Sequence, residues 1–91
     1  MMHLVAYDVS DNGARARLAA LLCKHGVRLQ RSVFECDLDE TGLETVLEAA
    51  RTLLDLRRDS LQVDALCGAC RARRHTLGQA PVDLDARYWL V

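Results

Sequence analysis

The stretch HLVAYD at residues 3–8 decides the fold, because it is short, apolar and rich in residues that favour β-strands. A run of this kind, without an alternating polar face, is typical of a central strand that is covered on both sides. Ser10, Asp11 and Asn12 follow at once, and all three are good helix N-caps. The beginning of the chain therefore predicts a central strand that leads directly into a helix.

Two amphipathic helices are predicted from apolar side chains at helical spacing. The first covers residues 14–25, with Gly26 as its stop, and the second covers residues 43–54 after a turn and cap at residues 39–42. Basic side chains crowd the end of the second helix, as the helix dipole prefers. These are Arg51, Arg57 and Arg58.

Further strands are predicted at residues 27–38, 60–66 and 73–77, and the β-prone end Tyr88–Val91 forms a tail strand. The predicted order is βαββαβ plus this tail, which indicates an α+β, ferredoxin-like sandwich. We expect residues 1–78 to form the domain. Residues 79–91 would be a C-terminal tail whose strand, with Trp89, is exchanged with a partner subunit to bury apolar surface.

The composition indicates one small domain inside the cell. A chain of 91 residues with 51% hydrophobic residues can build a single modest core. We see neither a signal peptide nor a membrane-spanning run, so a cytoplasmic location is expected. The formal net charge is −1, but residues 1–34 carry five basic and two acidic side chains, whereas residues 35–66 carry three basic and nine acidic ones. The basic first third is where a nucleic acid would bind.

Asp8 is the most informative candidate for chemistry, because it ends the first strand immediately before a helix start. A carboxylate beside a helix N-terminus can bind a divalent cation next to a phosphate. The alternative is that Asp8 merely helps Ser10 and Asp11 to cap the helix. Two copies of Asp8 in a twofold dimer would build one shared site. They would repel one another until a metal bound, so cleavage should rise with pH and require a divalent cation.

Four arginines form a possible basic rim for phosphates: Arg15, Arg17, Arg28 and Arg31. Arg15 and Arg17 are two residues apart on the first helix, so they project in different directions. In a continuous strand, Arg31 would share a face with Val33, whereas Arg28 would align with Phe34. Phe34 would then shape the groove or a subunit contact. The alternative is that these are ordinary solvated arginines around a core phenylalanine.

The cysteine pair at Cys67 and Cys70 leaves two alternatives open. A zinc site would need two further ligands, and the candidates are His25, His75, Cys23 and Cys36. No second close pair exists, so a structural turn with reduced thiols is favoured over zinc.

Taken together, these motifs resemble the CRISPR-associated protein 2 family. The matching segments are YDVS at residues 7–10, the pair Arg15 and Arg17, GVRLQRSVFE at residues 26–35, and the segment from Asp59 to Gly78 with its cysteine pair. Their most specific element is the block Gln30, Ser32, Val33 and Phe34 at the right distance from Asp8.

The resemblance implies a homodimer with exchanged C-terminal strands that works with the CRISPR integrase, CRISPR-associated protein 1, in acquiring new spacers. It implies a metal-dependent endonuclease acting on single-stranded RNA or double-stranded DNA, with Mg²⁺ or another cation such as Mn²⁺ at Asp8. The arginines would bind nucleic acid, and a second set would support the site or the dimer: Ser10, Gln30, Ser32, Phe34 and Trp89. Two rivals remain, namely a non-catalytic DNA-binding adaptor that bridges integrase dimers and a toxin-like ribonuclease of similar fold.

Overall fold

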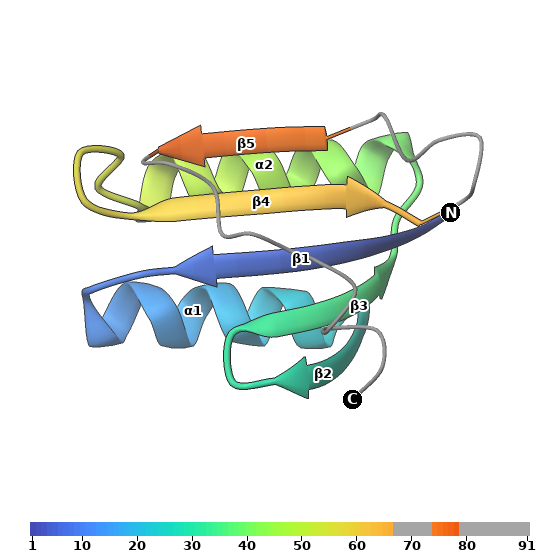
Figure 1. Cartoon of the computed structure of the whole chain (residues 1–91), viewed down its shortest axis with the longest axis horizontal. Helices are drawn as coiled ribbons and strands as arrows, with labels where there is room; N and C mark the ends of the chain where they lie inside the picture. The colour runs from blue at the N-terminus through green and yellow to red at the C-terminus, as the bar shows by residue number, and fades with distance from the viewer. Residues whose placement is uncertain (67–73, 79–91) are drawn as a thin grey trace.

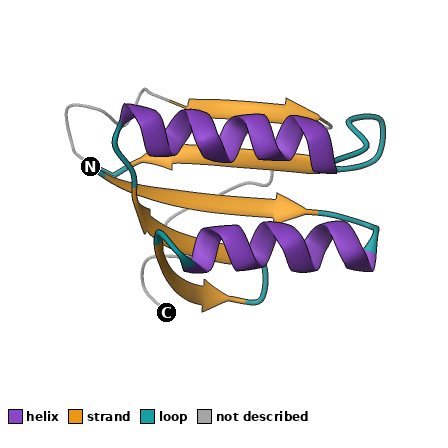
Figure 2. Cartoon of the chain, turned by 180° about the vertical axis from the view of Figure 1, so that it is seen from behind, coloured by secondary structure: helices purple, strands orange, loops and turns teal. Residues whose placement is uncertain are grey.

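The computed structural model describes residues 1–66 and 74–78, and two helices lie on one face of its five-stranded antiparallel sheet (Figures 1 and 2). The strand order in the sheet is β2-β3-β1-β4-β5. The elements along the chain are β1 (Met2–Asp8), α1 (Asn12–Cys23), β2 (Gly26–Gln30), β3 (Val33–Asp37), α2 (Glu40–Leu53), β4 (Ser60–Ala65) and β5 (Arg74–Gly78).

The central position predicted for the first strand is confirmed. β1 pairs antiparallel with β3 on one side and with β4 on the other. The first four strands lie in the order β2-β3-β1-β4, which is the arrangement of a ferredoxin-like sandwich, and β5 extends the sheet beyond β4. The α+β, ferredoxin-like prediction is therefore confirmed.

The single strand predicted at residues 27–38 is wrong, because this stretch forms the hairpin of β2 and β3 with a turn at Arg31 and Ser32. A continuous strand of that length would extend about 40 Å, well past the seven residues of β1. The usual two-residue hairpin turns need Gly or Asn at positive φ. Neither turn residue has a positive φ, and the register instead shifts between Arg28 and Gln30. Because neither Arg31 nor Ser32 is Gly or Asn, the local sequence does not carry the signal of these usual hairpin turns.

The main core lies between the sheet and the two helices. The predicted helix faces are confirmed, since Leu18 and Leu22 of α1 and Val46 and Ala50 of α2 are completely buried. The strands contribute six side chains to this core: Val5, Tyr7, Phe34, Cys36, Leu61 and Val63.

Gly26 does not stop the first helix, which ends at Cys23 with Lys24 as its C-cap in a right-handed conformation. Gly26 is instead the first residue of β2 and pairs with Cys36. A Cβ at this position would overlap the carbonyl oxygen of Glu35. The glycine therefore permits the close approach of two strands rather than a helix end.

The face of the sheet opposite the helices also has an apolar centre. Strand residues alternate between faces, so Leu4 and Ala6 of β1 lie opposite Val5 and Tyr7. With Val33 they form a second buried cluster. The polar positions of β4 lie on this face as predicted, but Gln62 is completely buried.

A buried carboxylate joins two loops at the carboxyl end of β1. Asp59 is 1% exposed, and its carboxylate accepts hydrogen bonds from the backbone N–H of Ser10 and of Asp55, both at 3.0 Å. Burial by itself raises the pKa of Asp59, but these hydrogen bonds outweigh it and hold the pKa below its usual value. Asp59 thereby connects the β1–α1 loop to the α2–β4 loop.

The strand predicted at residues 73–77 is confirmed as β5, displaced by one residue. The predictions for Cys67, Cys70, Trp89 and the tail at residues 79–91 lie outside the described residues. No helix in the described part of the chain is long and apolar enough to cross a bilayer.

Gly26→Ala should lower the free energy of unfolding by about 1–3 kcal/mol, because the new methyl group would push β2 away from Glu35. Gly13→Ala is the matched control, since Gly13 lies in α1, where alanine favours the helix. Urea unfolding of both variants measures the difference. Equal stabilities for the two variants would contradict the proposed close approach.

Asp59→Asn should lower the free energy of unfolding by about 1–3 kcal/mol at pH 7, because a charged acceptor of two N–H groups is lost. The folded-state pKa of Asp59 lies below its unfolded value, so this contribution is present above about pH 4 and is lost as the pH falls through the folded-state pKa. Unfolding curves of both proteins from pH 7 down to pH 3 should therefore converge. A constant gap would mean that the charge of Asp59 does not contribute.

Candidate nucleic-acid interface at the end of the first strand

A hollow of about 290 Å³ opens at the carboxyl end of β1. It is lined by the end of β1, the first turns of α1 and the β2–β3 turn, and the last of these lies about 20 residues further along the sequence. Its lining residues are Tyr7, Asp8, Val9, Arg15, Arg31 and Ser32. The sequence predictions for Asp8, Arg15, Arg31 and Ser32 thus fall at one place.

Asp8 is exposed at the last position of β1, where it pairs with Ser60 of β4. The helix cap is Asp11, whose Oδ2 accepts a hydrogen bond of 2.7 Å from the Ala14 N–H. Asp8 therefore does not cap α1, which was the alternative reading of this residue. Its carboxylate accepts no hydrogen bond from any residue that the structure describes, so it remains available to a ligand.

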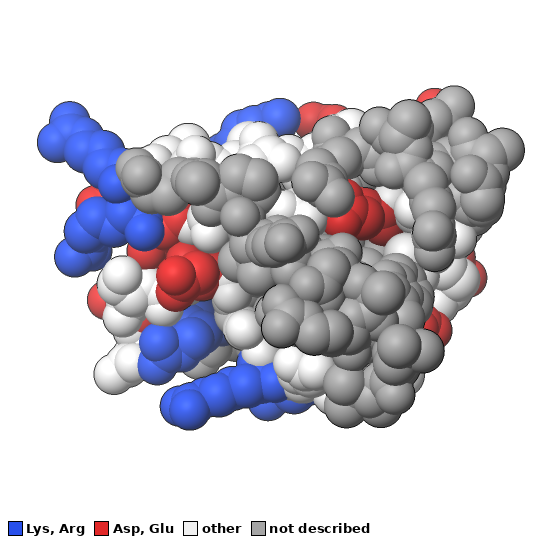
Figure 3. Space-filling model, viewed as in Figure 1, with Lys and Arg blue, Asp and Glu red and all other residues white. Residues whose placement is uncertain are grey.

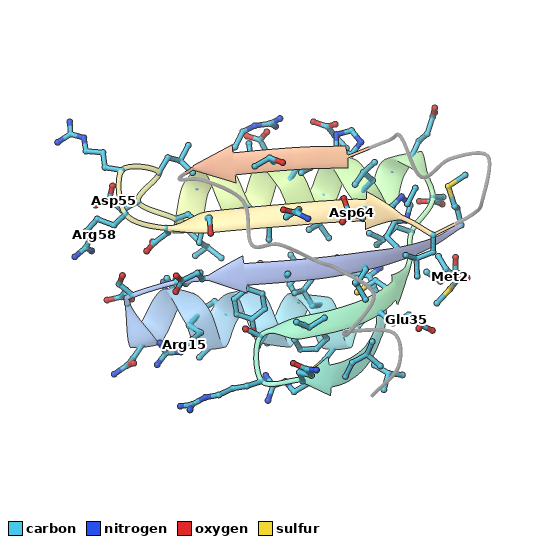
Figure 4. The ribbon with its side chains drawn as sticks, in the orientation of Figure 1. Met2, Arg15, Glu35, Asp55, Arg58 and Asp64 are labelled. Carbon is cyan, nitrogen blue, oxygen red and sulfur yellow. The ribbon has the colours of Figure 1, made fainter. Side chains whose placement is uncertain are left out.

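Arg15 stabilises the β1–α1 connection, which begins directly after Asp8. Its Nη1 donates to the Val9 carbonyl at 3.0 Å, and its Nη2 donates to Oδ1 of Asn12. Figure 4 shows Arg15 projecting from α1 at this end of the molecule. Arg15 is half-buried, and these two contacts hold its guanidinium at the hollow, where the side chain is still partly exposed.

Arg28 and Arg31 meet at one hollow, although strict alternation predicted opposite faces for them. A second depression of about 270 Å³ is lined by both of these residues together with Arg15. The predicted separation of Arg31 from Arg28 is wrong because the turn at residues 31–32 ends the strand between them, whereas Arg28 does share a face with Phe34, its partner across the hairpin. The Arg28 guanidinium lies over the Phe34 ring, 5.0 Å from its centroid, which is a cation–π contact.

Phe34 is completely buried in the core, where its ring stacks on that of Tyr7 at 6.2 Å. It therefore lies below the surface and supports Arg28 from beneath. Ser32 contributes its carbonyl oxygen, which accepts a hydrogen bond from the Tyr7 N–H at 3.1 Å. These contacts attach the β2–β3 turn to β1.

The remaining predicted residues lie outside the hollows. Arg17 is exposed on α1 and lines neither depression, as expected from its spacing from Arg15. Gln30 is half-buried at the end of β2, and Ser10 contributes its backbone N–H to Asp59. Sequence reasoning missed the role of Asp59. Asp59 directly precedes β4, and β4 pairs with β1. Only the topology shows that this position lies beside the β1–α1 connection.

The charges at this end of the molecule are arranged in an alternating pattern. Figure 3 shows basic side chains over the α2–β4 loop and a second basic group near α1 and the β2–β3 turn, with acidic side chains between them. The near-neutral formal charge of the chain therefore hides a local pattern of cation, anion and cation. Such a surface fits a polyanion that brings or shares a divalent cation.

The donor chemistry fits a hard divalent cation in part. Carboxylate oxygen is the ligand that Mg²⁺ prefers, and one or two carboxylates with waters and phosphates suffice. Within residues 1–66 and 74–78, no three side chains of ligand type gather, and the carboxylate that lines the hollow is that of Asp8. Cys36, a zinc candidate from sequence, is buried, and this burial raises the pKa of its thiol to about 11. A neutral thiol is a poor zinc ligand.

Comparisons with known proteins identify the family of this chain. The family described as CRISPR associated protein Cas2 matches residues 1–74. The CRISPR-associated endonuclease Cas2 2 of Thermus thermophilus is 48% identical over 67 residues, covering 74% of this chain and 74% of that protein. The CRISPR-associated endoribonuclease Cas2 1 of Archaeoglobus fulgidus is 36% identical over 85 residues, covering 92% of this chain and 90% of that protein.

Solved structures show the same fold. The crystal structure of Streptococcus pyogenes Cas2 at pH 6.5 has a TM-score of 0.69 and 30% identity, over 86% of this chain and 100% of that one. A hypothetical protein, TT1823 from Thermus thermophilus, has a TM-score of 0.68 and 48% identity, over 74% of this chain and 82% of that one. The family match, the relatives and the shared fold together confirm the predicted resemblance: this chain belongs to the CRISPR-associated protein Cas2 family.

Proposed function

We propose that this chain is a metal-dependent endonuclease of CRISPR adaptation, with Asp8 as its catalytic carboxylate. The observation that carries the proposal is the difference in hydrogen bonding and exposure among three neighbouring carboxylates. Asp11 caps α1 and Asp59 is buried between two loops, whereas Asp8 is exposed in a hollow with Arg15 and Arg31. The names of relatives support the activity, since they include both endonuclease and endoribonuclease.

The arginines would bind the phosphodiester backbone and orient it across the hollow. Arg31 and Arg28 reach it from the β2–β3 side and Arg15 from α1, and guanidinium groups bind phosphate oxygens in a bidentate manner. Asp8 would hold Mg²⁺, or another cation such as Mn²⁺, which when bound supplies the positive charge that a phosphodiester needs beside a carboxylate. Without that charge, Asp8 would repel the substrate.

A homodimer in the cytoplasm is part of the proposal. One subunit offers a single exposed carboxylate at the hollow, and a second copy would add another Asp8. The dimer would act with the CRISPR integrase on DNA, and on RNA where the endoribonuclease activity applies.

The second candidate function is a non-catalytic adaptor that holds DNA for the integrase. The same basic surface favours it, because backbone binding needs no metal, and the single carboxylate that lines the hollow is few for a nuclease. The two functions differ in what they require of Asp8.

Asp8→Asn should abolish cleavage of nucleic acid. The free energy of unfolding should stay nearly unchanged and the affinity for nucleic acid should stay within about twofold of the wild type, because Asp8 is exposed and accepts no hydrogen bond from the described residues. Cleavage by the wild type should require a divalent cation, stop with EDTA and rise with pH. Asp11→Asn is the control, since it removes a neighbouring charge, keeps an oxygen that can cap the helix and leaves Asp8 in place. Undiminished spacer acquisition by Asp8→Asn would favour the adaptor.

Arg31→Ala should weaken binding to duplex DNA and reduce the slope of log affinity against log salt by about 1, because one phosphate contact is lost. Lys24→Ala is the matched control, since it removes one positive charge at the opposite end of α1. Fluorescence anisotropy across a salt series measures both variants. Equal effects of the two substitutions would show that binding follows net charge rather than this hollow.

A further inference from the structure

The α2–β4 loop, residues 54–59, lies beside Asp8 on the side away from the β2–β3 turn. Asp8 pairs with Ser60, the first residue of β4, so the loop ends directly next to the candidate site. Figure 4 shows Arg58 and Asp55 at this end of the molecule, and Arg15 projecting from α1 below them. The loop therefore adjoins the hollow without lining it.

Internal hydrogen bonds hold this loop in a closed turn. The Asp59 and Arg58 N–H groups donate to the Asp55 carbonyl at 2.7 and 2.9 Å, and the Arg57 N–H donates to the Asp55 side chain at 3.0 Å. The buried Asp59 carboxylate attaches the turn to Ser10, in the middle of the β1–α1 connection. The backbone that carries Arg57 and Arg58 is therefore ordered relative to Asp8 before any ligand binds.

Both arginines of the loop are exposed, and the Arg58 side chain is 62% exposed. In the described part of the chain, the Arg58 guanidinium contacts Asp55 through Nε at 3.2 Å. An ion pair at such an exposed position contributes little stability, so a phosphate can compete for the guanidinium. The sequence explained these residues only as helix-end charges, but α2 ends at Leu53, so both lie beyond the helix.

We propose that Arg57 and Arg58 form a second phosphate-binding contact, on the opposite side of Asp8 from Arg15 and Arg31. The two arginine pairs would hold successive parts of one nucleic-acid backbone, so that the backbone crosses Asp8 between them. Asp59 acts as the positioning residue of this contact, because it fixes the loop against the β1–α1 connection. The inference rests on the proposed nucleic-acid function and extends its binding surface.

The test uses the full chain and measures binding to a DNA duplex and to a single-stranded RNA of equal length over a salt series. The double variant Arg57→Ala and Arg58→Ala should bind about tenfold more weakly at 0.1 M salt, and its salt slope should fall by about 2 on the duplex and about 1.4 on the single strand. Lys24→Ala with Arg51→Ala is the control, since it removes the same charge elsewhere.

Two further variants separate binding from a structural role. Arg57→Lys with Arg58→Lys keeps both charges and should restore most of the affinity. Asp59→Asn should weaken binding in the wild-type background and add little to the double alanine variant, because both changes act on the same contact. If the double variant does not fold, the single alanine variants take its place, each with a slope lowered by about 1 on the duplex.

Two results would overturn the inference, and they are distinguishable. If the double alanine variant matches the control in affinity and slope on both nucleic acids, while Arg31→Ala still weakens binding, the loop contact is absent and the proposed function stands. If the wild-type chain binds neither nucleic acid, the proposed function fails and this inference fails with it.

Discussion

The antiparallel pairing of β1 on both sides is the constraint on which the rest of the structure depends. Because β3 and β4 both run opposite to β1, each of them begins where β1 ends. The turn before β3 and the loop before β4 therefore meet at Asp8. One pairing pattern thus brings together the basic turn, the acidic strand end and a second basic loop, from segments about 25 residues apart in sequence.

Three acids near this junction have different roles because their surroundings differ. Asp11 is used by the backbone of α1, and Asp59 is buried and used by two backbone N–H groups. Both stabilise the folded chain through charge-assisted hydrogen bonds. Asp8 ends β1, is exposed and accepts no hydrogen bond from the residues that the structure describes, so its charge is open to solvent in the hollow that Arg15 and Arg31 also line. Two of the three carboxylates are therefore used by the fold, and the third is left exposed at the hollow.

Most of the fold could be predicted from local signals. The apolar run of β1, the periodic apolar faces of α1 and α2, and the cap at Asp39 are confirmed because each depends on neighbours in the sequence. The β2–β3 turn could not be predicted, since Arg31 and Ser32 include neither Gly nor Asn, the residues that mark the usual two-residue hairpin turns. Gly26 was assigned to a helix end, although what requires a glycine there is a strand approaching from ten residues away.

The sequence by itself determined most of the secondary structure, the family and the identity of Asp8 as a candidate, because strand and helix periodicity and short motifs are local properties. Only the tertiary structure decided which charges share one surface: that Arg28 and Arg31 line the same hollow, and that Asp59 joins two loops beside Asp8. The physical reason is that these relations depend on strand order and register, which long-range hydrogen bonds and core packing select together.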